Sequence, residues 1–382
     1  MPLVQPRPRS AMTALALTWP ARPANLCTEE PRKHLRRSLT RKWNMAETER
    51  VLVTIAMDFA DEILSELRDL SPRLQIERHF PHVSHDVMAR TEVLYTSGYF
   101  PEPEQAPKLR WIQLHTAGVN HAINHAIVQA EDIVVTSTSG IHASNMAQYC
   151  LMAMLMFNYR MRLAFDLQGR AEWPADSHAL FTPIDMDLQT VGIVGYGSIG
   201  RELARICAAI GMTVLATKRD ISRTEESNAF IMPGFGDPTG DIPDRIYPAN
   251  TITSMAKDCD YLVVTVPHTD DTEHLVDDEV FAAMKESAVL VNVSRGAVVD
   301  EKALITALSS EVIAGAVLDV FEEEPLPSAS PLWNLDNVII TPHLSGFTRD
   351  YHKKAAQVFK ANLRRYLDND SLLNQLDRAI GY

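Results

Sequence analysis

The sequence predicts an α/β fold in which short parallel strands alternate with helices. Three observations predict it: strand-like apolar runs recur along the chain, segments with helical spacing of apolar residues separate them, and a glycine-rich turn follows one of the runs. With 382 residues, 46% hydrophobic and 22% charged, the composition is that of a globular protein of two or three domains. No apolar stretch approaches the ~20 residues of a membrane-spanning helix, so we expect no membrane segment.

The first predicted α/β unit begins just after Met45. Its strands are expected at 51–57, 93–95, 112–114 and 133–135, with a helix at 59–70. A helix at 144–163 follows, and its methionine stripe is expected to be core. Strands of a second unit are expected at 191–194, 213–216, 261–266, 289–293, 313–318 and 338–340, before a last helix at 349–367.

Charge is distributed unevenly along the chain. Residues 1–45 carry nine Lys or Arg against two Glu, so the formal net charge of −13 becomes −20 for residues 46–382. An acidic body disfavours nucleic acid as a partner. The basic segment 1–45 is expected to be a disordered tail or a mitochondrial presequence, and a start at Met45 is a further alternative. We expect a cytoplasmic protein, or a mitochondrial one if residues 1–45 are a presequence.

The four cysteines are Cys27, Cys150, Cys207 and Cys259, and no two of them have CxxC spacing. This pattern argues against a zinc site and against a disulfide framework. We therefore expect no metal and a reducing compartment.

A glycine-rich turn, Gly195-Tyr196-Gly197-Ser198-Ile199-Gly200, separates the strand at 191–194 from a helical segment. Gly195 permits a tight turn, Gly197 lets a pyrophosphate approach the backbone, and Gly200 lets the helix pack closely on the strand. Ser198 and Ile199 then lie at a helix N-terminus that faces the phosphate charge. The turn predicts a nucleotide site.

The stretch between Arg219 and Asp260 is punctuated by Gly and Pro, which favours turns and surface loop. It is either a tolerated insertion or a lobe that closes over the adenine end of a cofactor or joins a subunit contact.

Three later segments each follow a predicted strand, where ligands gather in open α/β sheets. They contain, in order, Arg295 in 291–300, a run of glutamates in 318–327, and His343 in 340–346. An arginine can grip the carboxylate of a 2-oxo acid bidentately. A histidine can protonate the alkoxide that a hydride leaves, and a carboxylate on its far ring nitrogen favours the imidazolium.

Together with the glycine turn, these segments resemble the D-isomer-specific 2-hydroxyacid dehydrogenases, from about Val51 to Leu367. The resemblance implies that Arg295, Glu324 and His343 are catalytic and that Arg295 also binds the substrate carboxylate. Glu324 is chosen among three glutamates because it directly precedes a proline, as the family's acid does.

The same resemblance implies binding roles. It places Asp319 near the nicotinamide carboxamide, with Pro267 and Ser294 along the cofactor cleft. The backbone N–H groups of Ala117 and Gly118 are expected to hold the substrate carboxylate, since small residues let it reach the backbone.

Two departures from the family's pattern concern the cofactor and the hinge. Lys218, followed by Arg219, stands where members that use NAD carry an acid. Cations there attract the 2′-phosphate of NADP, so we expect NADP to be preferred, with NAD as the alternative because Asp220 follows at once. Gln148 stands where the family usually has glutamate and is expected to affect packing or the hinge.

We thus expect two Rossmann/flavodoxin-like parallel-sheet domains with a cleft between them. Residues 46–147 with 345–382 are expected to form the substrate domain, and 148–344 the dinucleotide-binding domain. The expected activity is NADP-preferring reduction of a short 2-oxo acid to a D-2-hydroxy acid, similar to glyoxylate or hydroxypyruvate reductases, in a homodimer that contacts through the Met-rich helix and the nucleotide domain. A non-enzymatic NAD(H)-binding sensor, similar to corepressors of this fold, is the alternative.

Overall fold

The computed structural model describes residues 50–226, 228–378 and 381. The expectations for residues 1–45 lie outside this part of the chain. The described residues build two parallel sheets with helices on both faces, which confirms the predicted fold class. Within these ranges every helix is too short or too polar to cross a bilayer.

The first sheet has five strands in the order β2-β1-β3-β4-β5, and each neighbouring pair is parallel. This is the flavodoxin-like order. Its strands are β1 (Val51–Ile55), β2 (Leu74–Arg78), β3 (Val93–Thr96), β4 (Trp111–Leu114) and β5 (Val134–Thr136).

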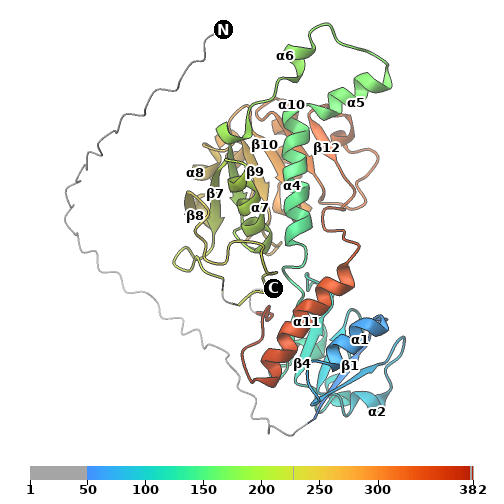
Figure 1. The fold of residues 1–382 in the computed structure, drawn as a ribbon. Helices are drawn as coiled ribbons and strands as arrows, with labels where there is room; N and C mark the ends of the chain where they lie inside the picture. Colours follow the sequence, from blue (N-terminus) through green and yellow to red (C-terminus); the bar gives the residue numbers. More distant parts are fainter. Residues whose placement is uncertain (1–49, 227, 379–380, 382) are drawn as a thin grey trace, which may run out of the picture. The chain divides into compact units, whose positions relative to one another are not determined.

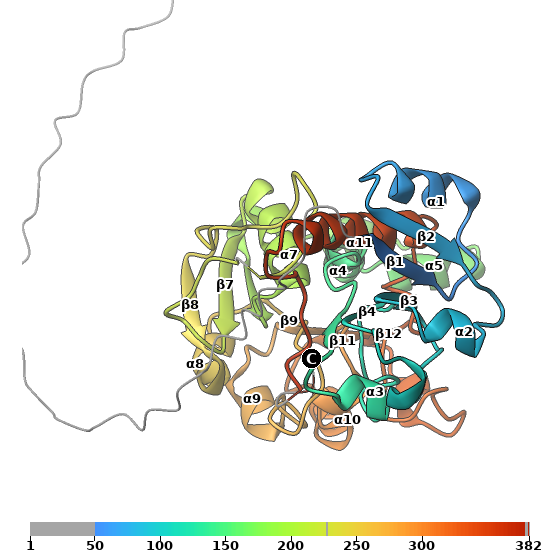
Figure 2. The same cartoon turned by 90° about the horizontal axis from the view of Figure 1, so that it is seen from below.

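Helices cover both faces of this sheet. One face packs on α1 (Asp61–Arg68) and on the C-terminal helix α11 (Tyr351–Leu367), which lie beside each other in Figure 2. Phe359 and Tyr366 of α11 contact the Trp111 ring, with centroids 5.3 and 5.4 Å away. The opposite face packs on the short helices α2 (His85–Met88) and α3 (Ala126–Gln129), and a 3-10 turn, η1 (Pro103–Gln105), precedes β4.

The second sheet has seven parallel strands in the order β12-β11-β10-β9-β6-β7-β8. If the strands are numbered from β6 and read from the β8 edge, the order is 3-2-1-4-5-6-7. This is the doubly wound 3-2-1-4-5-6 arrangement that binds dinucleotides, with one strand added at the end. The strands are β6 (Thr190–Val194), β7 (Thr213–Lys218), β8 (Arg245–Pro248), β9 (Tyr261–Val264), β10 (Val289–Asn292), β11 (Gly315–Leu318) and β12 (Val338–Ile340).

Two groups of helices sandwich the seven strands (Figure 1). On one face lie α4 (Ala143–Asn158) and α7 (Ser198–Ala209). The other face packs on α8 (Ile252–Ala256), α9 (Asp278–Ala283) and α10 (Glu301–Ser309). The 3-10 turns η2 (Met186–Leu188), η3 (Ala249–Thr251), η4 (Gly296–Val298) and η5 (Pro331–Asn334) connect these elements.

The expected helix at 144–163 is two helices in the structure. Helix α4 ends at Asn158, Arg160 takes a left-handed conformation (φ 48°), and α5 (Met161–Gly169) begins. The chain then runs through α6 (Ser177–Phe181), and both helices extend beyond the end of the sheet in Figure 1. At its N-terminal end α4 begins at Ala143, five residues before the position at which the dinucleotide-binding domain is expected to start. Met146 and Ala147, in these first turns, already pack in the core of the seven-stranded sheet.

Candidate active site

The glycine turn has the geometry that a bound dinucleotide needs. Gly195 has φ 102°, and a Cβ there would fall 2.6 Å from a Val266 methyl group. A Cβ on Gly200 would fall 2.3 Å from the Gly195 carbonyl oxygen, so only glycine allows α7 to pack so closely. Gly197 is exposed, and no heavy atom lies within 4 Å of a Cβ built there. A phosphate can therefore approach the start of α7, where Ser198 and Ile199 follow, and these residues fit the cofactor.

At the end of β7, Lys218 lies near the charge of Arg201 and near the carboxylates of Glu226 and Asp220. Lys218 is half-buried; burial lowers its pKa, and the nearby charge of Arg201 lowers it further. Arg201 is fully buried, lies 4.7 Å from the Tyr196 ring centroid, and donates to the carbonyl oxygens of Thr224 and Asp237. These contacts tie the glycine turn and α7 to the loop at 219–244.

Arg219 lines a second cavity, of about 610 Å³, with His268 and Thr269 on the loop after β9. Pro267, on the same loop, is exposed, and its carbonyl oxygen accepts a hydrogen bond from Thr272 Oγ1 at 2.7 Å. Arg219 and Pro267, both expected to bind the cofactor, therefore flank the C-terminal ends of the central strands of the sheet.

The end of β10 shapes the loop of Arg295. Asn292 Nδ2 donates to the Arg295 carbonyl oxygen at 3.1 Å, and Asn292 Oδ1 accepts from the Ser294 N–H and hydroxyl at 3.1 and 3.2 Å. Ser294 is thus buried with its hydroxyl turned toward Asn292. A Cβ on Gly296 would overlap the Phe321 backbone at 1.8 Å, so this loop requires glycine. Arg295 Nη2 lies 3.5 Å from where a Gly118 Cβ would stand, which brings the guanidinium to the loop after β4.

His343 and Glu324 form a pair beside Arg295. His343 Nδ1 lies 2.7 Å from Glu324 Oε2, and Glu324 Oε1 accepts from the Phe321 N–H at 3.0 Å. Both side chains are partly exposed. Of the neighbouring glutamates, Glu322 instead contacts His274 at 3.2 Å. The Glu324 contact fixes the imidazole so that Nε2 is the ring nitrogen left for a ligand.

Asp319 is fully buried, and its carboxylate faces the His343 loop. It accepts hydrogen bonds from Thr341 Oγ1 at 2.6 Å and from the N–H groups of Leu344 and Ser345 at 2.9 Å. The expectation for this residue was a contact with the nicotinamide carboxamide. In the structure its carboxylate binds the loop that carries His343, and the contact with the nicotinamide carboxamide stays a prediction.

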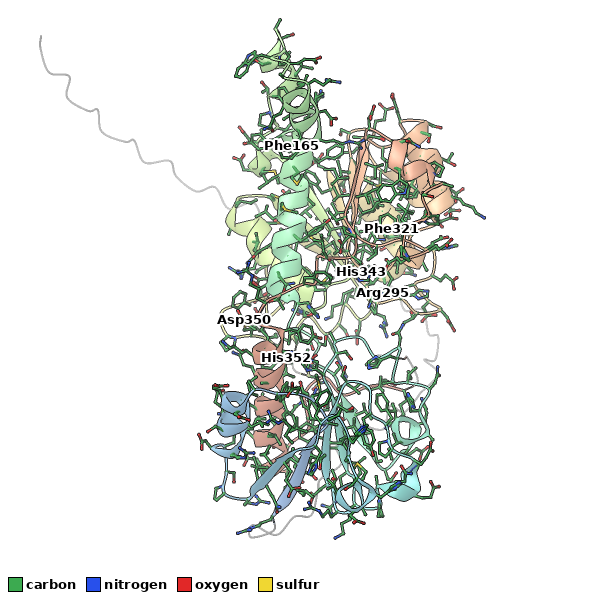
Figure 3. The ribbon with its side chains drawn as sticks, turned by 90° about the vertical axis from the view of Figure 1, so that its right-hand side faces the viewer. Phe165, Arg295, Phe321, His343, Asp350 and His352 are labelled. Carbon is green, nitrogen blue, oxygen red and sulfur yellow. The ribbon has the colours of Figure 1, made fainter. Side chains whose placement is uncertain are left out.

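A cavity of about 970 Å³ lies beside these groups. Arg295 and His343, close together in Figure 3, line it from the seven-stranded side, and Ala117 and Gly118 line it from the loop after β4. The sequence motifs did not point to several other lining residues: His121, His142, Phe347, Thr348, Arg349 and Tyr351. Most of these belong to the two segments where the chain crosses between the sheets, and no motif marks them.

The charge of the cavity suits an anion. Among its described lining residues are two arginines and three histidines but no carboxylate. A cationic pocket in a chain of net charge −13 attracts small anions into the site. Gln148 is exposed and bonds to Ser144 Oγ at 3.1 Å on its own helix, away from this cavity. No cluster of three His, Cys, Asp or Glu side chains suited to a metal occurs within the described ranges.

Comparison with known proteins agrees with this geometry. Residues 151–345 match the model of the D-isomer specific 2-hydroxyacid dehydrogenase, NAD binding domain. A glyoxylate reductase of Korarchaeum cryptofilum is 33% identical over 68% of this chain and 74% of its own length. An (S)-sulfolactate dehydrogenase of Chromohalobacter salexigens is 30% identical over 68% of this chain and 78% of its own.

Among solved structures, a D-isomer specific 2-hydroxyacid dehydrogenase of Xanthobacter autotrophicus, in complex with NADPH and MES, is 27% identical with a TM-score of 0.69. That alignment covers 87% of this chain and 100% of the other. These matches confirm the resemblance that the motifs indicated. The chain belongs to the D-isomer specific 2-hydroxyacid dehydrogenase family, whose members are NAD(P)-dependent oxidoreductases.

Proposed function

We propose that this protein reduces short 2-oxo acids to D-2-hydroxy acids with NADPH. The observation that carries the proposal is that Arg295, His343 and the Ala117–Gly118 loop line one cavity, with Glu324 on the histidine. Residues 46–147 with 345–382 would be the substrate domain, and 148–344 the dinucleotide-binding domain. The relatives named glyoxylate reductase support a small substrate of this class.

Each group has a defined task in the proposed reaction. Arg295 and the N–H groups of Ala117 and Gly118 bind the substrate carboxylate and so orient the neighbouring carbonyl group. The glycine turn would hold NADPH, which would supply a hydride to the carbonyl carbon. His343 donates the proton from Nε2 to the carbonyl oxygen, which becomes the hydroxyl group. Glu324 holds the imidazolium through Nδ1 and stabilises its charge until the proton leaves.

NADP is the preferred cofactor in this proposal. Lys218 and Arg219 replace the acid that would repel a 2′-phosphate, and the buried charge of Arg201 lies close to Lys218. The related Xanthobacter protein was crystallised with NADPH. NAD remains the alternative, through Asp220.

A substrate panel tests the activity. Purified protein is mixed with glyoxylate, hydroxypyruvate and larger 2-oxo acids, each with NADPH and with NADH, and absorbance at 340 nm is followed. We expect turnover that Arg295→Gln and His343→Asn nearly abolish while the Kd for NADPH, from fluorescence titration, stays within a few-fold. Nucleotide binding without turnover of any acid would instead support the non-enzymatic sensor.

A homodimer fits the surface of the segment around α5 and α6. Large apolar side chains there are exposed: Tyr159, Phe165, Trp173 (91%), Ile184 and Leu188 (75%). So many exposed apolar residues on one projecting segment mark an interface, and a second copy is the occupant we propose. Light scattering should give twice the 42.7 kDa chain mass, and Phe165→Glu with Trp173→Glu should give the monomer. A monomeric wild type would reject the dimer.

A cytoplasmic location is part of the same proposal. Cys150, Cys207 and Cys259 are buried free thiols, as in proteins of a reducing compartment. Fractionation of cells that express the full chain tests this location against the mitochondrial alternative.

A further inference from the structure

Helix α4 carries a row of polar side chains that grips the segment containing His343. His142, Asn145 and Tyr149 are spaced by three and four residues, which places them on one helix face. His142 Nδ1 lies 2.9 Å from the Gly346 carbonyl oxygen, and Asn145 Nδ2 donates to the Ser345 carbonyl oxygen at 3.1 Å. These side chains therefore connect the start of α4, where the chain first crosses between the two sheets, to residues 345–346, where it crosses back.

Tyr149 contacts a side-chain hydroxyl of this segment, whereas His142 and Asn145 contact its backbone oxygens. Its OH lies 2.6 Å from Thr341 Oγ1, which in turn lies 2.6 Å from Asp319 Oδ1. The Thr341 hydroxyl has one proton, and it donates that proton to the carboxylate, which can only accept. Tyr149 must then be the donor to Thr341. Burial raises the pKa of Tyr149 to about 12, so it keeps this proton at neutral pH.

The Asp319 carboxylate, at the end of this chain of hydrogen bonds, binds residues on both sides of His343 in the sequence. Asp319 accepts from Thr341 on one side of the histidine and from the N–H groups of Leu344 and Ser345 on the other. The Asp319 backbone oxygen accepts from the His343 N–H itself at 2.9 Å. His343 has φ 51°, a left-handed conformation that a non-glycine residue keeps only when its surroundings impose it.

We propose that Tyr149 and Thr341 are positioning residues that, through Asp319, hold His343 in the backbone conformation that presents its ring to Glu324 and to the cavity. Neither residue touches the substrate in this proposal. Tyr149 and Thr341 act by removing conformational freedom from the proton donor. The inference rests on the proposed function, since the proposed function makes His343 the proton donor.

A packing role and a positioning role predict different kinetics. Loss of one buried hydrogen bond changes stability modestly, whereas a small displacement of a catalytic group lowers turnover much more. Substrate and cofactor are bound by other groups, namely Arg295, the Ala117–Gly118 loop and the glycine turn. The positioning role therefore predicts a change in kcat with little change in KM or in the Kd for NADPH.

The test compares three variants of the hydrogen-bond chain and one control variant with wild type. Thr341→Val deletes the hydroxyl while nearly keeping the side-chain shape, and kcat should fall on the order of 10- to 100-fold. Thr341→Ser keeps the hydroxyl and should restore most of kcat. Adding Tyr149→Phe to Thr341→Val should cost almost nothing more, because both changes break one chain of hydrogen bonds. Thr54→Val is the matched control, since Thr54 is buried with its hydroxyl 2.7 Å from Thr91 in the other sheet.

Amide hydrogen exchange supplies a readout that needs no activity. In the ligand-free protein, a peptide spanning 341–347 should exchange faster in Thr341→Val than in wild type or Thr341→Ser. Wild-type kcat in Thr341→Val, or an equal loss in Thr341→Ser, would overturn the proposal, as would unchanged exchange. If wild type turns over no 2-oxo acid, the proposed function fails, while the exchange experiment still decides whether this hydroxyl orders the loop.

Discussion

At the scale of single residues, Lys218 decides the cofactor prediction. Lys218→Asp places an acid where the ribose hydroxyls of NAD would bind and repels a 2′-phosphate. The ratio of kcat/KM for NADPH to that for NADH should fall by at least about tenfold. Lys257→Asp makes the same charge change at an exposed position at the end of α8 and should leave the ratio unchanged. An unchanged ratio in Lys218→Asp would contradict NADP preference through this residue.

His115 links protonation to stability. It directly follows β4 and has 6% of its surface exposed. Its Nδ1 lies 2.7 Å from the Tyr95 hydroxyl oxygen, and its ring stacks on that of His352 with 5.0 Å between the centroids. Burial, with the nearby charge of His352, lowers the pKa of His115 to about 4. Below about pH 6.5 the unfolded chain binds this proton and the folded protein does not. The contribution of neutral, buried His115 to the free energy of unfolding is therefore complete above about pH 6.5 and is lost as the pH falls toward 4.

We expect His115 to contribute on the order of 1–2 kcal/mol to the loss of unfolding free energy between pH 7 and pH 5. Urea unfolding of wild type and His115→Asn at both pH values measures it. The asparagine keeps an acceptor for Tyr95 but does not titrate, so the variant should show the smaller pH dependence. His82→Asn, at an exposed position, serves as control and should behave as wild type. Equal pH dependence in His115→Asn would refute the assignment.

The sequence could predict the candidate site residues that belong to motifs, because each motif follows a buried strand and the ends of parallel strands converge. Arg295, Glu324 and His343 are such residues. The partners that hold them are different: His142 and Gly346 are 204 positions apart, and Tyr149 and Thr341 are 192 apart. No local pattern encodes a contact of that separation. The orientation of Asp319 toward the His343 loop also depends on backbone geometry, which a motif does not specify.

At the scale of elements, the break between α4 and α5 stores backbone strain. Arg160 follows the last residues of α4 with φ 48°, a position where helices commonly end in glycine. Arg160→Gly should raise the unfolding free energy by about 0.5–1 kcal/mol, since the Cβ penalty exceeds the extra entropy of glycine when unfolded. Arg170→Gly, at the right-handed end of α5 (φ −94°), is the matched control and should not stabilise. Urea midpoints of both variants decide this, and a destabilised Arg160→Gly would contradict it.

The sequence patterns predicted every central strand of both sheets, and of the edge strands only β5 and β12, whose runs are wholly apolar or nearly so. The runs at 191–194, 261–266 and 289–293 became central strands because continuous apolar sequence fits a sheet covered by helices. Strands β2 and β8 were not expected, and both are edge strands in which polar residues interrupt the apolar pattern. Their pairing depends on the neighbouring strand, which single-sequence periodicity does not reveal. The end of α4 was missed for a similar reason, since apolar spacing continues through 163.

At the scale of the whole described chain, the loop at 219–244 joins parts that the sequence suggested were separate. Phe230 packs with Ile141, Ala355 and Val358, so the loop touches both the start of α4 and helix α11. The Phe230 N–H donates to Asn374 Oδ1 at 2.9 Å. This stretch is thus more than a surface loop. Besides the two chain crossings, it forms a non-covalent connection that any hinge closure would have to accommodate.

Phe230→Ala tests how much that connection contributes. Phe→Ala changes in protein cores cost about 3–5 kcal/mol, and this site should lie at or below the lower end because a loop can collapse into the space. We expect a lower thermal midpoint and faster hydrogen exchange both in 228–235 and in the first turns of α11. Phe235→Ala is the control: Phe235 lies on the same loop but faces Arg205 of α7, 5.8 Å from its ring centroid. That variant should loosen the loop while α11 exchanges as in wild type. If Phe230→Ala leaves α11 exchange unchanged, the loop does not restrain the helix.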